Sequence, residues 1–279
     1  MKIKIDNIKT QYVKSGAGKT LVLLPAWRMD IQRVSEVVDF LSEYYTVYFL
    51  NVPGYGNREN FQKVYSLQNY SDFIYRWIKE LNLTDITLLG TSMGGPIAYY
   101  LLKNDNKIFQ KVIFLAPWYN LKCANYPHKV LKGMATLIKA LSKKPFQGIG
   151  DSILRNEKLV LAYMRLITPK ENFKNMKNMI RYADNFKNFS YKAFMESMYY
   201  TLNCDLDSEN QKMNHKAIFI MSKNDHQLSY EKTLQGYKRL FSNLVEIPLT
   251  HRFHAPRTWI TKKIISDYFG KAFIEANQL

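Results

Sequence analysis

Short apolar runs alternate with stretches of helical periodicity along the first 120 residues of the chain. Continuous apolar or β-branched runs predict strands, and apolar residues spaced three and four apart predict helices. Residues 20–25, for example, form an apolar run that predicts a strand buried on both faces. Asp30 is the predicted N-cap of the helix that follows. The predicted order is strand 2–5, strand 9–14, strand 20–25, helix 31–43, strand 45–52, helix 70–83, strand 85–89, helix 93–102 and strand 111–115.

The pattern changes after Pro117. No strand is predicted from residue 119 to about residue 212, where helical stretches rich in Lys, Met and aromatic residues follow one another. Residues 119–200 contain 15 Lys and Arg against five Asp and Glu, so this segment holds much of the positive charge. The helices predicted here are 131–141, 151–166, 172–186 and 191–202. Alternation then resumes with strand 217–221, helix 230–241, strand 244–249 and helix 258–273.

Alternating strands and helices predict the α/β class, with a mostly parallel central sheet and helices on both faces. A helical segment that interrupts this alternation after the sixth strand is typical of a cap. We therefore expect a core formed by residues 1–118 and 213–279, and a helical cap formed by residues 119–212.

Composition excludes several classes of protein. With 47% hydrophobic and 14% aromatic residues, the 279-residue chain is neither disordered nor of low complexity. No apolar run approaches the roughly 18 residues that span a bilayer, and the N-terminus lacks the apolar region of a signal peptide. Two cysteines, Cys123 and Cys204, are too few for a disulfide framework. A soluble, cytoplasmic protein without a membrane span is expected.

The net charge of +17 suggests an acidic partner, namely nucleic acid, an anionic membrane surface or an acidic carrier protein. The alternative is that the abundant Lys, Asn, Tyr and Ile reflect the base composition of the genome. No nucleic-acid-binding motif accompanies the charge, so no nucleic-acid partner is expected.

The sequence Gly90-Thr91-Ser92-Met93-Gly94 lies between a predicted strand and a predicted helix. G-x-S-x-G at such a junction is the nucleophile-elbow pattern, in which small residues allow a sharp turn that exposes the serine. The same turn directs the Met93 backbone N–H, at a helix N-terminus, toward the oxygen that becomes negative. The alternative is a glycine-rich turn with an incidental serine.

A nucleophilic serine needs a base and a carboxylate that orients the base. Of five histidines, His251 and His254 follow the last predicted strand and therefore lie at the same sheet edge as Ser92. His251 is nearer the strand end and is the predicted base, with His254 as the alternative. Asp225 follows strand 217–221 and is the predicted carboxylate, since no acid follows strand 111–115. The alternative interpretation is that Asp225 is an ordinary turn residue without a catalytic role. A metal site at His251 and His254 lacks a nearby carboxylate, so no metal and no cofactor are expected.

These residues resemble the α/β-hydrolase family, in the group with a helical cap, because the order Ser92, Asp225, His251 matches that family's. Residues 21–27 resemble the family's strand leading into a His-Gly-x oxyanion loop, with Pro25 and Ala26 in place of His and Gly. The resemblance implies that the Trp27 backbone N–H is the second oxyanion donor beside that of Met93. Residues 51–56 resemble the family's structural Asp-x-Pro-Gly-x-Gly turn, with Asn51 for Asp.

The resemblance implies a serine hydrolase that cleaves a carboxylic ester or thioester through an acyl-enzyme. A serine at the elbow argues against relatives that use Asp, such as haloalkane dehalogenases and epoxide hydrolases. Apolar residues at 130–200 predict a pocket for an apolar acyl group, although the same spacing is also typical of plain core. The basic cap resembles that of pimeloyl-carrier methyl-ester esterases, which makes an acidic acyl carrier protein a candidate partner. The alternative function is an inactive scaffold that acts as a binding module.

Overall fold

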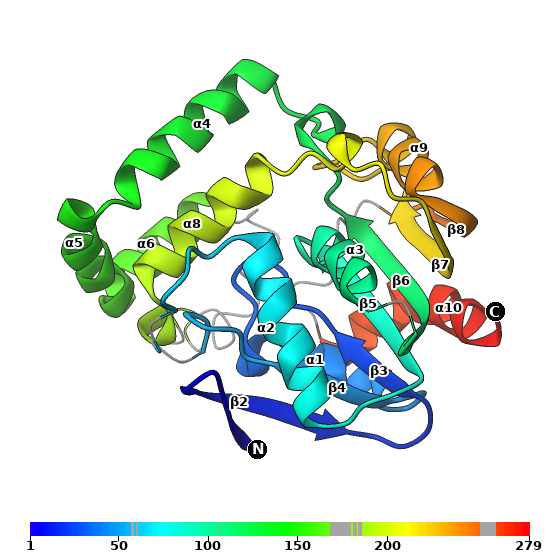
Figure 1. The fold of residues 1–279 in the computed structure, drawn as a ribbon. Coiled ribbons are helices and arrows are strands. Elements are labelled where there is room, and N and C mark those ends of the chain that lie inside the picture. The colour runs from blue at the N-terminus through cyan, green and yellow to red at the C-terminus, as the bar shows by residue number, and fades with distance from the viewer. Residues whose placement is uncertain are drawn as a thin grey trace.

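The computed structural model describes residues 1–56, 59, 61–105, 107–167, 180, 183, 186–251 and 261–279. Within them, eight strands form one sheet in the order β1-β2-β4-β3-β5-β6-β7-β8 (Figure 1). The β1–β2 and β2–β4 pairs are antiparallel and every other pair is parallel, which confirms the predicted sheet. The strands are β1 Lys2–Ile5, β2 Ile8–Ser15, β3 Thr20–Leu23, β4 Thr46–Leu50, β5 Ile86–Ser92, β6 Phe109–Pro117, β7 Met213–Ser222 and β8 Phe241–Leu249.

Helices cover both faces of the sheet because successive residues of a buried strand point to opposite sides. In β3, Val22 joins one hydrophobic cluster and its neighbours Leu21 and Leu23 join the other. The helices α2, α3 and α9 complete the first cluster, and α1 and α10 complete the second (Figure 1). Their bounds are α1 Ile31–Leu41, α2 Leu67–Glu80, α3 Gly94–Asn104, α9 Tyr230–Leu240 and α10 Lys262–Gln278. Asp30 caps α1 as predicted, since its side chain accepts a hydrogen bond from the Arg33 N–H at 2.9 Å.

The chain between β6 and β7, residues 119–212, is called the helical insertion below. Its described helices are α4 His128–Leu141, α5 Lys144–Arg155, α6 Glu157–Ile167 and α8 Tyr191–Leu202, with 3-10 turns at Leu121–Cys123, Phe186–Asn188 and Leu206–Ser208. The single helix predicted over 151–166 is wrong. The chain turns at Asn156, whose backbone is extended and whose side chain accepts a hydrogen bond from the Leu159 N–H, so that α6 starts anew. The helix predicted over 172–186 lies mostly outside the described residues, and the division into core and cap stays a prediction.

Polar contacts tie the two ends of the helical insertion together. Asn120, just after β6, donates hydrogen bonds to Asp205 and Asp207 near the start of β7, at 3.1 and 2.8 Å. Asp207 also accepts a hydrogen bond from the Tyr119 hydroxyl and forms an ion pair with Arg239 of α9. These contacts hold the helical insertion at the carboxyl end of β6, the edge of the sheet at which the candidate catalytic residues lie.

The aromatic core around β6 gives a test of the fold. Phe114 is fully buried, and its ring centroid lies 4.4 Å from that of Tyr237 and 5.1 Å from that of Phe241. We expect Phe114→Ala to lower the free energy of unfolding by about 3–5 kcal/mol, because it leaves a cavity that the sheet cannot close. Leu137→Ala, at a side chain that is 59% exposed, should change it by less than about 0.5 kcal/mol. Urea unfolding of both variants measures the difference, and equal effects would contradict this account of the core.

Candidate active site

Ser92 is the last residue of β5, and α3 begins two residues later. Its φ angle is +49°, in the left-handed region that a residue with a side chain rarely adopts. Such strain persists only where the surrounding structure enforces it, and it is concentrated at functional sites. The half-buried Ser92 side chain therefore occupies a sharp strand-to-helix turn at the carboxyl edge of the sheet.

Three glycines permit this turn, because a side chain would collide with neighbouring groups at two of them and would be tightly packed at the third. A Cβ at Gly90 would lie 2.4 Å from the Gly94 carbonyl oxygen, and one at Gly95 would lie 2.5 Å from Pro117 Cβ. A Cβ at Gly94 would meet Leu24 Cβ at 3.3 Å and the Pro25 carbonyl oxygen at 3.4 Å. The start of α3 is thus packed tightly against β5, against the end of β6 and against the segment that follows β3.

The segment after β3, which contains the predicted oxyanion donor Trp27, passes close to this turn. The Leu24 N–H donates to the Leu89 carbonyl of β5 at 2.8 Å. The Trp27 indole N–H donates to the Phe194 carbonyl of α8 at 3.0 Å, and the two rings lie 4.8 Å apart. The sequence did not indicate this contact, which joins residues 167 positions apart. Trp27 therefore links the predicted oxyanion loop to the helical insertion.

Asp225 and His251 lie in the loops that follow the neighbouring strands β7 and β8. Asp225 is buried, and its Oδ1 accepts hydrogen bonds from the Gln227 and Leu228 N–H groups at 2.7 and 3.0 Å. Asp225 therefore stabilises a turn, which is the alternative role that the sequence allowed for it. Its charge also acts on His251, so the two side chains are electrostatic neighbours. The predicted base and the predicted carboxylate thus interact through their charges, and their catalytic roles stay a prediction.

Hydrogen bonds between the two loops hold His251 in place. The Ser222 hydroxyl donates to the His251 carbonyl, the Lys223 N–H donates to the Leu249 carbonyl at 2.8 Å, and Asn224 Nδ2 donates to the Thr250 carbonyl at 2.6 Å. Ser222 and Asn224 are supporting residues that the sequence analysis missed, because a lone serine or asparagine after a strand carries no specific signal.

Two opposing effects set the pKa of His251. Burial lowers the pKa below its ordinary value of 6.5, and the Asp225 carboxylate acts in the opposite direction because it favours the imidazolium. Tyr268 and Phe269 of α10 supply part of this burial, with ring centroids 4.8 and 4.9 Å from that of the imidazole. The net shift is downward, so His251 is neutral, as a general base must be, near neutral pH.

Sheet topology places all three predicted catalytic residues at one edge. β5, β6, β7 and β8 are consecutive parallel neighbours in the sheet, so the residues at their carboxyl ends lie on the same side. Ser92 ends β5, whereas Asp225 and His251 follow β7 and β8. His254, the alternative base, lies outside the described residues. Among the described residues, no group of three or more His, Cys, Asp or Glu side chains is placed to hold a metal ion.

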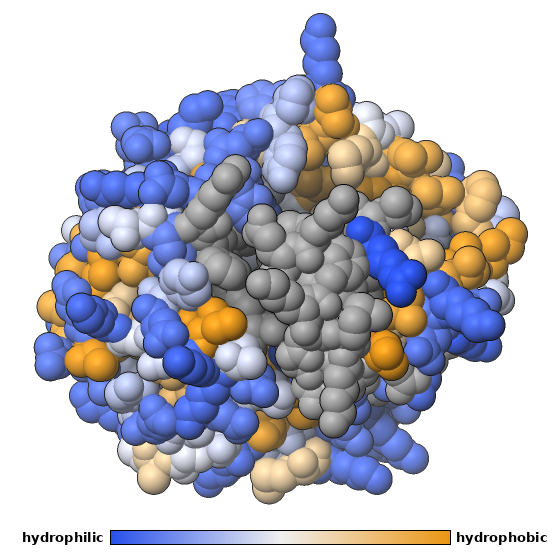
Figure 2. Space-filling view, turned by 180° about the vertical axis from the view of Figure 1, so that it is seen from behind, coloured by the Kyte–Doolittle hydropathy of each residue, from blue (hydrophilic) through white to orange (hydrophobic). Residues whose placement is uncertain are grey.

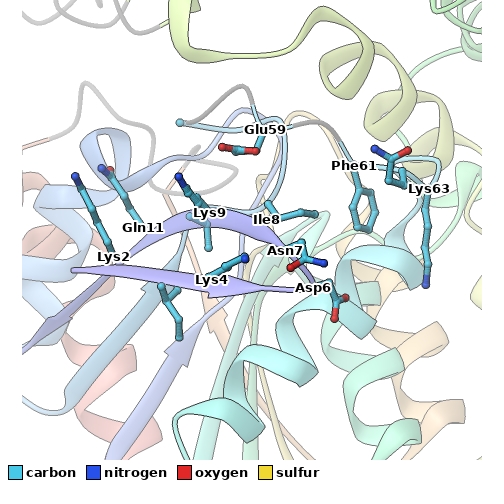
Figure 3. Close-up of a pocket in the computed structure, with 14 residues that line it drawn as sticks. Lys2, Lys4, Asp6, Asn7, Ile8, Lys9, Gln11, Glu59, Phe61 and Lys63 are labelled. Atoms are coloured by element: carbon cyan, nitrogen blue, oxygen red, sulfur yellow. The ribbon is translucent and has the colours of Figure 1, made fainter.

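An open cavity of about 1040 Å³ lies elsewhere, beside the hairpin formed by β1 and β2 (Figure 3). Its lining includes four lysines and two carboxylates, which are Lys2, Lys4, Lys9, Lys63, Asp6 and Glu59. None of the predicted catalytic residues lines it. The hairpin forms the opposite end of the sheet from β7 and β8, so this cavity is separate from the candidate active site.

Comparison with known proteins identifies the family and the fold. A family model described as the alpha/beta hydrolase fold matches residues 19–250. An uncharacterized hydrolase, YugF of Bacillus subtilis, is 22% identical over 231 residues, which cover 78% of this chain and 77% of YugF. A pimeloyl-[acyl-carrier protein] methyl ester esterase of Proteus mirabilis is 33% identical over 95 residues, about a third of either chain (33% and 35%).

Solved structures show the same fold. The esterase EaEST of Exiguobacterium antarcticum superimposes with a TM-score of 0.69 at 15% identity, and the match covers 100% of this chain and 99% of that one. At so low an identity the similarity establishes the fold, and the chemistry has to be argued from the residues of this chain.

Gly90 gives a test of the strand-to-helix turn. We expect Gly90→Ala to lower the free energy of unfolding by about 1–3 kcal/mol, because its Cβ would collide with the Gly94 carbonyl. Gly133→Ala in α4 is a matched control, since no atom lies within 4 Å of the added Cβ. This control should stabilise the protein by about 0.5–1 kcal/mol through helix propensity. Chemical denaturation compares the two, and a Gly90→Ala protein as stable as the control would exclude the close approach described here.

Proposed function

Because the chain belongs to the α/β-hydrolase family, we propose that the protein is a serine hydrolase that cleaves a carboxylic ester or thioester. One observation carries the proposal. Ser92 adopts a strained left-handed backbone at the sheet edge where Asp225 and His251 are electrostatic neighbours. Six other described residues with side chains also have positive φ, so the angle counts here because Ser92 lies in a G-x-S-x-G turn between β5 and α3. A buried carboxylate beside a neutral histidine is the arrangement that activates a hydroxyl.

The proposed reaction has two steps. In the first, Ser92 Oγ attacks the substrate carbonyl while His251 accepts its proton, and the alcohol or thiol then leaves with that proton. In the second, water attacks the acyl-enzyme, His251 again transfers the proton, and the carboxylic acid is released. Asp225 orients the imidazole and stabilises its charged form. The backbone N–H groups of Met93 and Trp27 hold the negative oxygen of each intermediate.

The helical insertion is the proposed cap and the main determinant of substrate choice. Trp27 contacts Phe194 of α8, so the helical insertion lies directly beside the proposed oxyanion loop. Phe194 and Phe186 are buried near Trp27, with ring centroids 6.1 Å apart, and this apolar environment supports an apolar acyl group in the substrate. The partial similarity to the carrier-protein esterase supports an acyl group carried on an acidic carrier protein as one form of that substrate.

Labelling with a fluorophosphonate tests the nucleophile. We expect the wild-type protein to be labelled and Ser92→Ala to lose both labelling and ester hydrolysis, to below about one-thousandth of the wild-type rate. Ser152→Ala, at an exposed serine of α5, is the control and should retain both. Circular dichroism checks that each variant is folded. A folded wild-type protein that resists the probe would favour the inactive scaffold instead.

The pH dependence of ester hydrolysis tests the base. Only neutral His251 accepts the proton, so kcat/KM should fall with decreasing pH around a midpoint below 6.5, since burial lowers the pKa of His251. Asp225→Asn removes the charge that favours the imidazolium. Its midpoint should therefore move to still lower pH, and kcat should fall by about 10⁴.

His128→Gln, at an exposed histidine that starts α4, is the control for this profile and should leave the midpoint unchanged. Initial rates with a short p-nitrophenyl ester give the profile of each variant. A midpoint that moves upward in Asp225→Asn would exclude His251 as the base.

A further inference from the structure

The helices α4, α5 and α6 each carry a row of large hydrophobic side chains that faces solvent. The spacing within each row is three or four residues, so its members lie on one side of their helix. Exposed fractions range from 40% to 64% in the eight residues Val130, Met134, Leu137, Phe146, Ile149, Ile153, Leu159 and Tyr163. These eight residues are called the outer apolar surface.

The outer apolar surface is distinct from the side by which these helices join the core. In α4, Leu131 and Ala135 are buried and Ile138 is partly buried against the core. Val130 and Leu137 each precede one of these residues, and a step of one residue turns a helix by about 100°. The apolar residues of α4 therefore form one broad arc of about 160°, of which only the part at Leu131, Ala135 and Ile138 packs on the core. In Figure 2, hydrophobic residues gather at the upper right, the side on which α4 and α5 lie.

Positive charge accompanies the outer apolar surface. Residues 128–167, which form α4, α5 and α6, contain eight Lys and Arg and only two Asp and Glu. On α4, Lys129, Lys132 and Lys139 lie away from the row of Val130 and Leu137, at about 80° or more around the helix. Long lysine side chains extend from such positions and place their ammonium groups at a polar boundary beside an apolar surface.

We propose that the outer apolar surface docks on the surface of an anionic lipid membrane. A helix with an apolar side and a lysine-rich side is the form that lies in a membrane interface, where apolar residues enter the lipid and cations meet the headgroups. The helix α4 has that form, and α5 and α6 each add an apolar row with one Lys and one Arg. Among the described residues, no helix is long and apolar enough to cross a membrane.

Charge and composition favour lipid over a protein partner. A second copy of the chain would bring the same excess of positive charge against this surface, and like charges repel. An acidic protein would satisfy the charge, but protein interfaces are enriched in Arg and depleted in Lys. Here six of the eight cations are Lys, and the apolar residues are mostly aliphatic. This is the composition of a surface that meets lipid.

Docking would bring the candidate active site close to the membrane. α4 packs on α8, and α8 holds Trp27 through the Phe194 carbonyl. Esters presented by the lipid surface are the substrates that this placement favours, a consequence that rests on the proposed function. Docking itself does not require catalysis, so the experiment uses Ser92→Ala protein and its outcome is independent of the hydrolase proposal.

Sedimentation with vesicles tests the docking. We expect Ser92→Ala protein to bind vesicles of phosphatidylcholine with phosphatidylglycerol, and to bind more weakly to phosphatidylcholine alone and at high salt. Adding Val130→Ser, Met134→Ser and Leu137→Ser should weaken binding at least about tenfold. The matched control adds Val64→Ser and Ile274→Ser, at side chains exposed to 44% and 43% but outside the outer apolar surface, and should bind as before. Equal binding by both variants would overturn the proposal.

A fluorescent label gives a second measurement that requires no loss of binding. Cys123 and Cys204 are buried, so a cysteine introduced by Leu137→Cys is the accessible site for an environment-sensitive dye. On anionic vesicles its emission should shift to the blue, whereas dye at Ile274→Cys should not shift. A shift caused by an acidic acyl carrier protein and not by vesicles would overturn the proposal in favour of a protein partner. A dimer that Leu137→Ser dissociates would overturn it in favour of self-association.

Discussion

The strained backbone at Ser92 is the constraint on which the rest of this structure depends. A residue with φ of +49° at the end of β5 is held there by its neighbours. The Trp118 N–H, just beyond β6, donates to the Ser92 carbonyl at 2.9 Å. The Trp118 carbonyl in turn accepts from the Tyr237 hydroxyl of α9 at 2.8 Å, and the same hydroxyl lies against Gly95 of α3. The turn is thus enclosed by β6, α3 and α9, and the free energy of core packing offsets the strain.

The predicted oxyanion loop is held by contacts that need no side chain at Pro25 or Ala26, the two positions at which it departs from the family's pattern. The Leu24 N–H bonds to β5, the Met29 N–H donates to the Ala26 carbonyl at 3.1 Å, and Asp30 then caps α1. None of these contacts uses a side chain at position 25 or 26. The His and Gly of the family's pattern are therefore not needed to hold the loop here, and their replacement is weak support for an inactive scaffold.

The sequence predicts the sheet and the positions of Ser92, Asp225 and His251 because both follow from strong local signals. A parallel strand buried on two faces is a continuous apolar run, and the residues after such strands meet at one edge. The features that the sequence does not predict depend on contacts between residues far apart in the chain. The break at Asn156 is hidden because apolar spacing continues across it. The hydrogen bond from Trp27 to α8 is hidden because an indole can find its acceptor anywhere in the fold.

The outer apolar surface shows most clearly that sequence periodicity does not reveal contacts between distant residues. Val130 and Leu131 are adjacent, both aliphatic and both at helical spacing from further apolar residues, yet one is 55% exposed and the other 7%. The periodicity of apolar residues predicts that α4 is amphipathic. It cannot tell which apolar residues pack on the core of the protein and which face an external partner, since both environments exclude water. Only the position of α8 divides the two. The helices α4, α5 and α6 leave eight large hydrophobic side chains facing solvent, which packing within the fold does not explain, and an exposed apolar surface of this kind is typical of a docking site.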